Sequence, residues 1–493
     1  MNSFFDTIEK INNVVNEFVG VKVGIFLLLA AGAYLTYIMK GFQITNIKVW
    51  MKYTFGALIH PEKNTEDKQA ISPFQSVCTA LAATVGTGNI AGVGAAIYIG
   101  GAGAVFWMWV AAFFGMMSKF AEQVLGIYYR RRNEQGEWNG GAMYYLLDGV
   151  GANPKLKGIA RLLAFLFAVF TMLAGFGIGN MSQVNKMVLS IKGTFLPNYV
   201  GPMVFGMSMY SLLIGICIMI ITSLVVLGGL QSIAHFAETM VPFMAIFYIV
   251  GSLIVIAGHI TNLPGALAAV FMNAFGTRAL AGGAAGVMMK TVITQGCKRG
   301  LFSNEAGLGS SVMAHSASTN TEPFVQGMWG IFEVFCDTFI ICTMTAMVIL
   351  VSGYVDLDTG MVVGGVTDAT IVAESFKTVL GQGGGIFATI ATFLFAFTTL
   401  VAWCQYGTKA TEYAFGTKAS GIYKYIFIFM ILQGSVMTSS LAWDISDTFN
   451  GLMMIPNLIG VLYLSPLIVR ISKNYMQRKN GEDVEPLVSY QKG

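Results

Sequence analysis

The chain has 493 residues, of which 55% are hydrophobic and only 11% charged. This is far more apolar surface than a soluble core of that length buries. Apolar runs of about 18 or more residues recur along the whole chain, which predicts a bundle of spanning helices and excludes a soluble domain with a single anchor. The net charge of +4 comes from short basic clusters between these runs, a pattern typical of membrane topology rather than of nucleic-acid binding.

The apolar runs predict an all-α membrane protein with eleven spans and no second domain. The first run, Val21 to Met39, follows an acidic segment without a small-residue cleavage pattern, so we expect it to remain as a helix rather than to be removed as a signal peptide. The expected spans cover roughly residues 21–40, 72–98, 103–127, 160–184, 202–227, 238–258, 264–296 (interrupted), 324–351, 385–408, 422–440 and 446–470.

The basic residues predict how these spans are oriented. With the N-terminus outside, the inside segments hold 22 Lys and Arg residues and the outside segments hold six. The inside total includes Lys290, near the end of the expected seventh span, and Lys298 and Arg299, which follow it. The positive-inside rule therefore predicts a multi-pass protein of the plasma (inner) membrane with its N-terminus outside and its C-terminus in the cytoplasm.

The second span contains a glycine-rich stretch that predicts a broken helix. Its sequence is ALAATVGTGNIAGVGAAIYIGG, with Thr87, Gly88 and Asn89 near mid-membrane. Several glycines together make unwinding easy. Unwound backbone is tolerated in a membrane only where it lines a cavity, and there its N–H groups suit a carboxylate and its carbonyls a cation. Close helix packing through the same glycines is an equally good interpretation of this stretch alone.

Two further stretches favour the broken-helix interpretation. Five spans later, LAGGAAGVMM (residues 280–289) interrupts another apolar run, and paired interruptions in two five-helix halves indicate a transporter's central site. In the ninth span, Thr398 and Thr399 are adjacent hydroxyls that suit a monovalent cation beside freed carbonyls. Each hydroxyl could instead bond to the preceding helical turn, which is the commoner arrangement.

Six segments between about residues 70 and 405 carry recognisable motifs. The longest is GGAGAVFWMWVAAFFG, from Gly100 to Gly115. The others are GTGNIAG (86–92), GIGNMSQVN (177–185), KRGLFSNEAGLGS (298–310), DTFIICTMTA (337–346) and FAFTTLVAW (395–403). In this order they resemble the alanine or glycine:cation symporter family, and the longest matches the family signature throughout.

The resemblance implies one N-terminal helix followed by a five-plus-five inverted-repeat amino-acid transporter core. The corresponding segments are 1–71 with the first helix and a cytoplasmic connection, 72–258 and 264–470 for the two repeats, and 471–493 for a cytoplasmic tail. It also implies symport of alanine or glycine with Na⁺ as the coupling ion, without enzymatic activity and without an obligate protein partner.

The resemblance assigns roles to particular positions. The substrate carboxylate is expected at Thr87, Gly88 and Asn89, with Gln183 contributing and Trp403 closing the pocket. The amine is expected near the carbonyls of residues 282–286. The Na⁺ ligands are expected to be the carbonyls of Ala82, Val85 and Phe395 with the hydroxyls of Thr398 and Thr399. The substrate-facing positions of the second break are Gly282, Gly283, Ala284, Ala285 and Gly286.

The two small residues between the glycines of the second break, Ala284 and Ala285, leave room for a substrate larger than alanine. Glu305 and Asp337 are possible gating groups. Glu305 could meet a loop arginine or cap a helix, and Asp337 could pair with Lys290 or Arg299. Because none of the expected pocket residues ionises, Na⁺ is favoured over H⁺.

Other functions remain as alternatives. A proton-coupled transporter of the same fold is the nearest, and a channel is less favoured because no ring of charges recurs. An intramembrane enzyme would need Glu333 and Asp337 to act together. Lys119 and Glu122, three residues apart on one helix, are interpreted as a helix-surface pair. Residues 367–380 form either a lid over the bundle or an ordinary surface helix.

Overall fold

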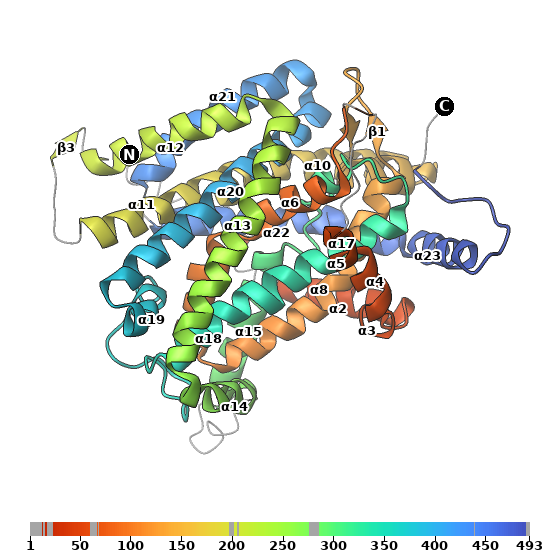
Figure 1. Ribbon diagram of the computed structural model, residues 1–493. Coiled ribbons are helices and arrows are strands. Elements are labelled where there is room, and N and C mark those ends of the chain that lie inside the picture. The colour runs from red at the N-terminus through yellow and green to blue at the C-terminus, as the bar shows by residue number, and fades with distance from the viewer. Residues whose placement is uncertain are drawn as a thin grey trace.

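The computed structural model describes residues 12, 15–16, 23–59, 67, 69–196, 202–204, 207–275, 285–437 and 439–489, and it is almost entirely helical (Figure 1). In the described residues the strands form two short antiparallel hairpins, β1 (Arg131–Arg132) with β2 (Trp138–Asn139) and β3 (Met203–Val204) with β4 (Met207–Ser208). The fold is therefore built by helix packing, as the composition predicts.

The helices of the first half are, in chain order, α2 (Ile25–Ile38), α3 (Phe42–Thr45), α4 (Ile47–Tyr53), α5 (Phe55–Ile59), α6 (Pro73–Thr84), η2 (Gly88–Gly92), α7 (Val93–Gly100), α8 (Gly103–Tyr128), α9 (Ala142–Tyr144), η3 (Tyr145–Gly149), η4 (Val150–Ala152), α10 (Lys157–Phe176), η5 (Gly177–Met181), α11 (Ser182–Phe195), α12 (Met209–Val226) and α13 (Gly229–Gly258).

The helices of the second half are η6 (Ile260–Asn262), α14 (Leu263–Ala274), α15 (Ala285–Asn304), α16 (Val312–His315), α17 (Pro323–Val334), η8 (Phe335–Cys342), α18 (Thr343–Val351), α19 (Ile371–Leu380), α20 (Gln382–Phe415), α21 (Thr417–Val436), α22 (Ser439–Tyr463) and α23 (Ser465–Lys479). Segments η2, η3, η5 and η8 are π-helical, and η4 and η6 are 3₁₀ turns.

Seven helices of the described residues are long and apolar enough to cross a membrane, and two bent pairs bring the number to nine. The pairs are α6 with the helix Gly88–Gly100, and the end of α22 with α23. Two more of the expected spans correspond by position to α2 and α15, but α2 has only 14 residues and α15 is not apolar enough to be counted. The number eleven therefore stays a prediction.

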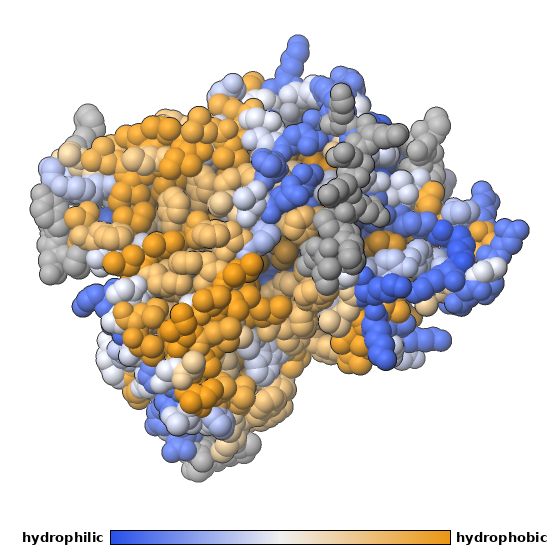
Figure 2. All heavy atoms as spheres, viewed as in Figure 1, coloured by the Kyte–Doolittle hydropathy of each residue, from blue (hydrophilic) through white to orange (hydrophobic). Residues whose placement is uncertain are grey.

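The outer surface has an apolar face of the kind a bilayer requires (Figure 2). Hydrophobic residues cover the side formed by α12, α13 and α21, whereas hydrophilic residues gather toward β1 and α23. Large apolar side chains such as Leu224, Ile246 and Tyr425 are more than half exposed there. In water such a surface would drive aggregation, so these helices face lipid.

The second expected span is broken where the glycine-rich stretch predicts. Helix α6 begins with a capping box, in which Ser72 accepts from the Gln75 N–H and the Gln75 side chain accepts from the Ser72 N–H. It ends at Thr84, and the helix Gly88–Gly100 continues at an angle of 51°. The break therefore lies inside the bundle. The four small residues at this point, Ala80, Ala82, Ala83 and Gly86, are all buried.

The seventh span differs from the expectation. Helix α15 continues to Asn304, packs against α8, and is followed by a non-helical stretch, 305–311, before α16. Lys298 and Arg299 thus lie on a helix rather than in a cytoplasmic loop. Without these two residues, the expected inside segments still hold more Lys and Arg than the outside segments. Of the expected break at 282–286, Gly282, Gly283 and Ala284 lie outside the described residues, and Ala285 and Gly286 begin α15.

The segment 367–380 contains α19, whose apolar side packs down on the bundle. Ile371, Val372 and Phe376 are buried against α20 and α18. A Cβ atom added to Gly94 of α7 would lie 3.1 Å from the side chains of both Ile371 and Val372. Helix α19 therefore packs over α7, the second half of the first broken helix, and whether it serves as a lid stays a prediction.

Candidate functional site

A cavity lies where the two helix interruptions meet. It measures about 440 Å³ including its open part. This is within the range of small-molecule sites. One wall comes from the first break and the other from the end of α15 and the stretch that follows. The lining residues are Ala83, Thr84, Gly86, Gly88, Gly92, Ile178, Gln183, Arg299, Phe302, Ser303, Glu305 and Thr399.

Side-chain amides bind the unwound backbone of the first break. The Gly86 N–H donates to Asn89 Oδ1 at 2.8 Å, and the Thr87 N–H and hydroxyl both donate to Gln183 Oε1, at 3.3 and 3.0 Å. Because α6 has ended, these donors have no partner within a helix. Three of the residues expected at the substrate, Thr87, Asn89 and Gln183, are thus joined in one network around this break.

Asn89 also links the first break to η8. Its Nδ2 donates to Asp337 Oδ1 at 2.6 Å, and Ser303 and Thr338 donate their hydroxyls to the same carboxyl group. The described hydrogen bonds of the Asp337 carboxyl come from these neutral groups, whereas a pairing with Lys290 or Arg299 stays a prediction. The Asp337 carboxyl is held by three neutral donors, one hydrogen bond away from the unwound backbone.

Glu305 lies at the second interruption and faces the cavity. The indole Nε1 of Trp403 donates to its Oε1 at 3.0 Å, and Ser310 donates to its Oε2. In the described residues, the hydrogen bonds of its carboxylate come from these two side chains and not from an arginine. An ionisable group therefore lines the pocket, which corrects the argument that none of the pocket residues ionises.

Oxygen atoms expected to bind a cation meet between α6 and α20. Thr399 Oγ1 lies 3.0 Å from both the Ala82 and the Phe395 carbonyl oxygens, donating to either. Thr398 Oγ1 bonds back to the carbonyls of Leu394 and Phe395, at 3.1 and 2.9 Å. The back-bonding alternative is thus present at both threonines, and Thr399 additionally bridges the two helices. No described contact places the Val85 carbonyl in this group.

The tightest approach at the site predicts a large effect for one glycine. A Cβ atom on Gly86 would lie 2.5 Å from Thr399 Oγ1. We expect Gly86→Ala to lower Na⁺-dependent uptake at least about tenfold, because overpacking of this size costs 1–3 kcal/mol and displaces the hydroxyl. Gly193→Ala, on α11 with nothing within 4 Å, is the control and should transport normally. Normal uptake by Gly86→Ala would contradict the placement of Thr399 against the break.

A second, larger network of buried charges lies behind the stretch 305–311. Lys119 of α8 donates to Glu333 of α17 at 3.0 Å and to Ser311 at 2.7 Å. Both charged side chains are fully buried. His315 Nε2 lies 3.2 Å from Glu333 as well. Lys119 therefore pairs with Glu333 and not with Glu122, which corrects the helix-surface interpretation.

Glu122 supports the second interruption from the same helix. Its Oε1 accepts from the Gly309 N–H at 3.1 Å and from Asn457 Nδ2 at 2.6 Å, and Asn457 also donates to the Gly307 carbonyl at 2.7 Å. Backbone that left its helix is thus satisfied by polar side chains from α8 and α22, as a membrane interior requires. In the described residues, the hydrogen bonds of Glu333 and of Asp337 are made with different partners.

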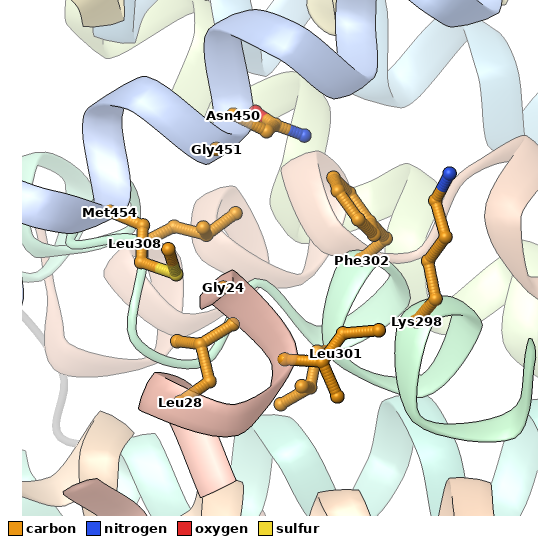
Figure 3. A pocket seen from close by; sticks show the side chains of 10 residues that line it. Gly24, Leu28, Lys298, Leu301, Phe302, Leu308, Asn450, Gly451 and Met454 are labelled. Atoms are coloured by element: carbon orange, nitrogen blue, oxygen red, sulfur yellow. The ribbon is translucent and has the colours of Figure 1, made fainter. Parts of the chain in front are cut away.

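Two other hollows lie away from the break. One of about 300 Å³ lies between α2, α15 and α22, where Leu28, Leu301 and Met454 line it (Figure 3). Phe302 borders both this hollow and the central cavity. The other, of about 610 Å³, is polar and lies where Lys409 of α20 pairs with Glu137 at 2.5 Å and Glu412 at 3.3 Å.

Comparison with known proteins agrees with this architecture. Residues 5–488 match the sequence profile of the sodium:alanine symporter family. The sodium/alanine symporter AgcS of Methanococcus maripaludis is 39% identical over 469 residues, which is 95% of this chain and 97% of that protein. The probable sodium/glutamine symporter GlnT of Bacillus subtilis is 34% identical over 483 residues, covering 97% of this chain and 92% of that protein.

The fold is also found among solved structures. The crystal structure of MhsT in complex with L-phenylalanine superimposes with a TM-score of 0.52, covering 83% of this chain and 99% of that one at 14% identity. At that identity the likeness concerns the fold alone. The profile match extends over nearly the whole sequence, and the relatives align almost from end to end. The chain therefore belongs to the sodium:alanine symporter family.

Proposed function

We propose that the protein is a secondary active symporter that imports a small neutral amino acid, alanine or glycine, together with Na⁺ by alternating access. The observation that carries this proposal is the central cavity at which two interrupted helices meet. Such breaks supply unpaired backbone groups to a substrate and an ion near the middle of a membrane. Family membership and the name of AgcS support the same reading.

The substrate carboxylate is proposed to bind at the first break. There the N–H groups of Gly86 and Thr87 are held by amide oxygens of Asn89 and Gln183. A carboxylate is a stronger acceptor than an amide oxygen, and the N-terminal end of the helix Gly88–Gly100 favours negative charge. The substrate would therefore replace Gln183 as the partner of Thr87, and Gln183 would be free to donate its amide N–H to it.

Sodium is proposed to bind between α6 and α20. The Thr399 hydroxyl oxygen already lies 3.0 Å from the carbonyl oxygen of Ala82 and 3.0 Å from that of Phe395. Neutral oxygen ligands suit a hard monovalent ion, which costs less to desolvate than a divalent one. Since the carbonyl of Ala82 precedes the break that binds the carboxylate, ion and substrate binding would stabilise the same backbone conformation, which is the basis of coupling.

In the membrane, the proposed arrangement is a five-plus-five core preceded by one helix, with the N-terminus outside and the C-terminus in the cytoplasm of the plasma membrane. The basic residues of α23 and of Arg130 to Arg132, which gather on the hydrophilic end of the molecule, support this orientation (Figure 2). Cysteine labelling tests this orientation. Single-cysteine variants in the β1–β2 hairpin should remain unlabelled when a reagent is added outside intact cells.

Uptake into liposomes tests the function. The purified protein is reconstituted, and radiolabelled alanine and glycine are followed under an inward Na⁺ gradient, with K⁺ replacement as the control. Accumulation that requires Na⁺ and is blocked by excess cold alanine or glycine is expected. Cold glutamine is included as a competitor, because GlnT carries that substrate in its name. No Na⁺-dependent accumulation of any of the three would refute the proposal.

A proton-coupled transporter of the same fold is the second candidate, and one observation favours it. Two buried carboxyl groups, Glu305 and Asp337, lie at or next to the cavity, and proton-coupled transporters use such groups as carriers. The same liposomes under an inward proton gradient without Na⁺ separate the two candidates. Accumulation driven by protons alone would select this one.

A further inference from the structure

The cavity is bordered by one buried carboxyl group that makes no direct ion pair in the described residues. Glu305 is 2% exposed, and its hydrogen bonds come from the neutral groups of Trp403 and Ser310. Lys119 attracts it from a longer distance but donates its hydrogen bonds to Glu333 and Ser311. A buried carboxylate without a cation in direct contact is costly, so a positive group that enters the cavity beside Glu305 would be stabilised.

The backbone at Glu305 is held in a conformation that side chains rarely adopt. Its φ is +54°, and it is one of two described non-glycine residues with positive φ. Such a residue costs about 1–3 kcal/mol and persists when the surroundings impose it, often at ligand sites. Here the left-handed turn follows the end of α15 and places Glu305 at the border of the cavity. The strain marks this side chain as positioned for a ligand.

The opposite wall of the cavity has the complementary charge character. The first break presents the N–H groups at Gly86 and Thr87 and the positive end of the helix Gly88–Gly100. Arg299 lines the cavity from α15 and reaches across to this wall, where its Cδ would lie 3.9 Å from a Cβ atom added to Gly92. A zwitterion that enters with its carboxylate on that wall turns its ammonium group toward the other one. Glu305 is the only carboxyl group among the lining residues of this cavity.

We propose that the Glu305 carboxylate binds the α-ammonium group of the transported amino acid, and this rests on the symport function proposed above. Two oxygens that each accept one neutral hydrogen bond retain lone pairs for an ammonium group. Trp403 and Ser310 act as positioning residues that fix the carboxylate. The site thereby selects α-amino acids against carboxylic acids of the same size, because a ligand without the ammonium group leaves Glu305 unpaired.

Binding to the purified full-length protein at saturating Na⁺ tests the proposal. Alanine is the probe, and propanoate, which is alanine without its amino group, is the competitor. We expect Glu305→Gln to weaken alanine binding about ten- to a hundredfold while the weak binding of propanoate stays the same or improves. Glutamine has the same length and the same backbone strain at this position. Its amide oxygen can still accept from Trp403, and the Ser310 hydroxyl can turn to accept from the amide N–H, so the loss of charge is the main change. Glu305→Asp keeps the charge on a shorter side chain. Its alanine affinity should lie between that of the unaltered protein and that of Glu305→Gln.

The matched control is Glu412→Gln, which neutralises a largely buried carboxyl group that pairs with Lys409 at the polar hollow and does not border the central cavity. Its ratio of alanine to propanoate affinity should equal that of the unaltered protein. Sodium binding without amino acid, followed by intrinsic tryptophan fluorescence, should be unchanged in Glu305→Gln. Loss of that Na⁺ binding would assign Glu305 to the ion and overturn the proposal, as would unaltered alanine affinity.

The unaltered protein provides tests that do not depend on the folding of a variant. If propanoate competes as strongly as alanine, no group in the site recognises the ammonium, and the inference is overturned while symport stands. If the unaltered protein binds alanine in neither the presence nor the absence of Na⁺, the proposed function itself fails. The two failures are therefore distinguished in one set of measurements.

Discussion

Thr399→Val is expected to raise the Na⁺ concentration that gives half-maximal uptake by about ten- to a hundredfold, because a hydrogen-bonding oxygen lost from a charged partner costs roughly 1.5–3 kcal/mol. Valine keeps the branched shape and removes only the hydroxyl that lies 3.0 Å from the Ala82 and Phe395 carbonyls. The maximal rate at saturating Na⁺ should change much less. The measurement is initial alanine uptake into liposomes across a series of Na⁺ concentrations.

The same helix supplies the control for this prediction. Thr411 is buried to the same degree and bonds only to the Gly407 carbonyl of the preceding turn, at 2.7 Å. Thr411→Val removes a back-bonded hydroxyl without touching α6, so its Na⁺ dependence should match that of the unaltered protein. Equal Na⁺ curves for the two valine variants would show that the Thr399 hydroxyl serves helix α20 alone.

Local composition was sufficient to predict the first break. Glycines that weaken a helix and a polar pair within an apolar run are both local features, and α6 ends where they begin. The network of Thr87, Asn89 and Gln183 also follows the positions that the family resemblance assigns. What composition did not predict is that side-chain amides, rather than the backbone alone, hold the freed N–H groups.

The interruption after α15 was not recognised, for a physical reason. The seventh span was placed by apolarity at 264–296, but α15 packs against α8 and other helices and so carries polar residues that a hydropathy argument assigns to a loop. The signal was present in the sequence as SNEAGLGSS, in which Gly307 and Gly309 adopt positive φ values of 87° and 74°. From the sequence, Glu305 in this segment is instead interpreted as a gating group or a helix cap.

Charge pairing was beyond sequence reasoning because it depends on tertiary contacts. Spacing of three residues suggested a pair between Lys119 and Glu122, yet the two side chains have different partners on α17 and α22. Periodicity tells which residues share a helix face, but not which distant helix that face meets. For the same reason, periodicity does not predict that Glu305 borders the cavity.

The Lys119–Glu333 pair gives the largest expected effect on stability. Lys119→Met leaves the Glu333 carboxylate buried beside His315 without its lysine, and breaking a buried pair in this way costs about 3–5 kcal/mol. We expect a clear loss of thermal stability in detergent, followed by the fraction of protein that remains monodisperse on size-exclusion chromatography after heating. Arg478→Met, which breaks the partly exposed pair with Glu322, should cost about 1 kcal/mol or less.

The double variant Lys119→Met/Glu333→Met separates charge from packing. If the loss in the single variant comes from an uncompensated charge, removal of both charges should restore much of the stability, because apolar replacements of a buried pair are often neutral or better. Transport by the double variant should nevertheless be impaired, since Ser311 would lose the Lys119 donor that ties the stretch 305–311 to α8. A double variant as unstable as Lys119→Met would instead mean that the hydrogen bonds to Ser311 and His315, rather than the charge balance, stabilise the region behind the second interruption.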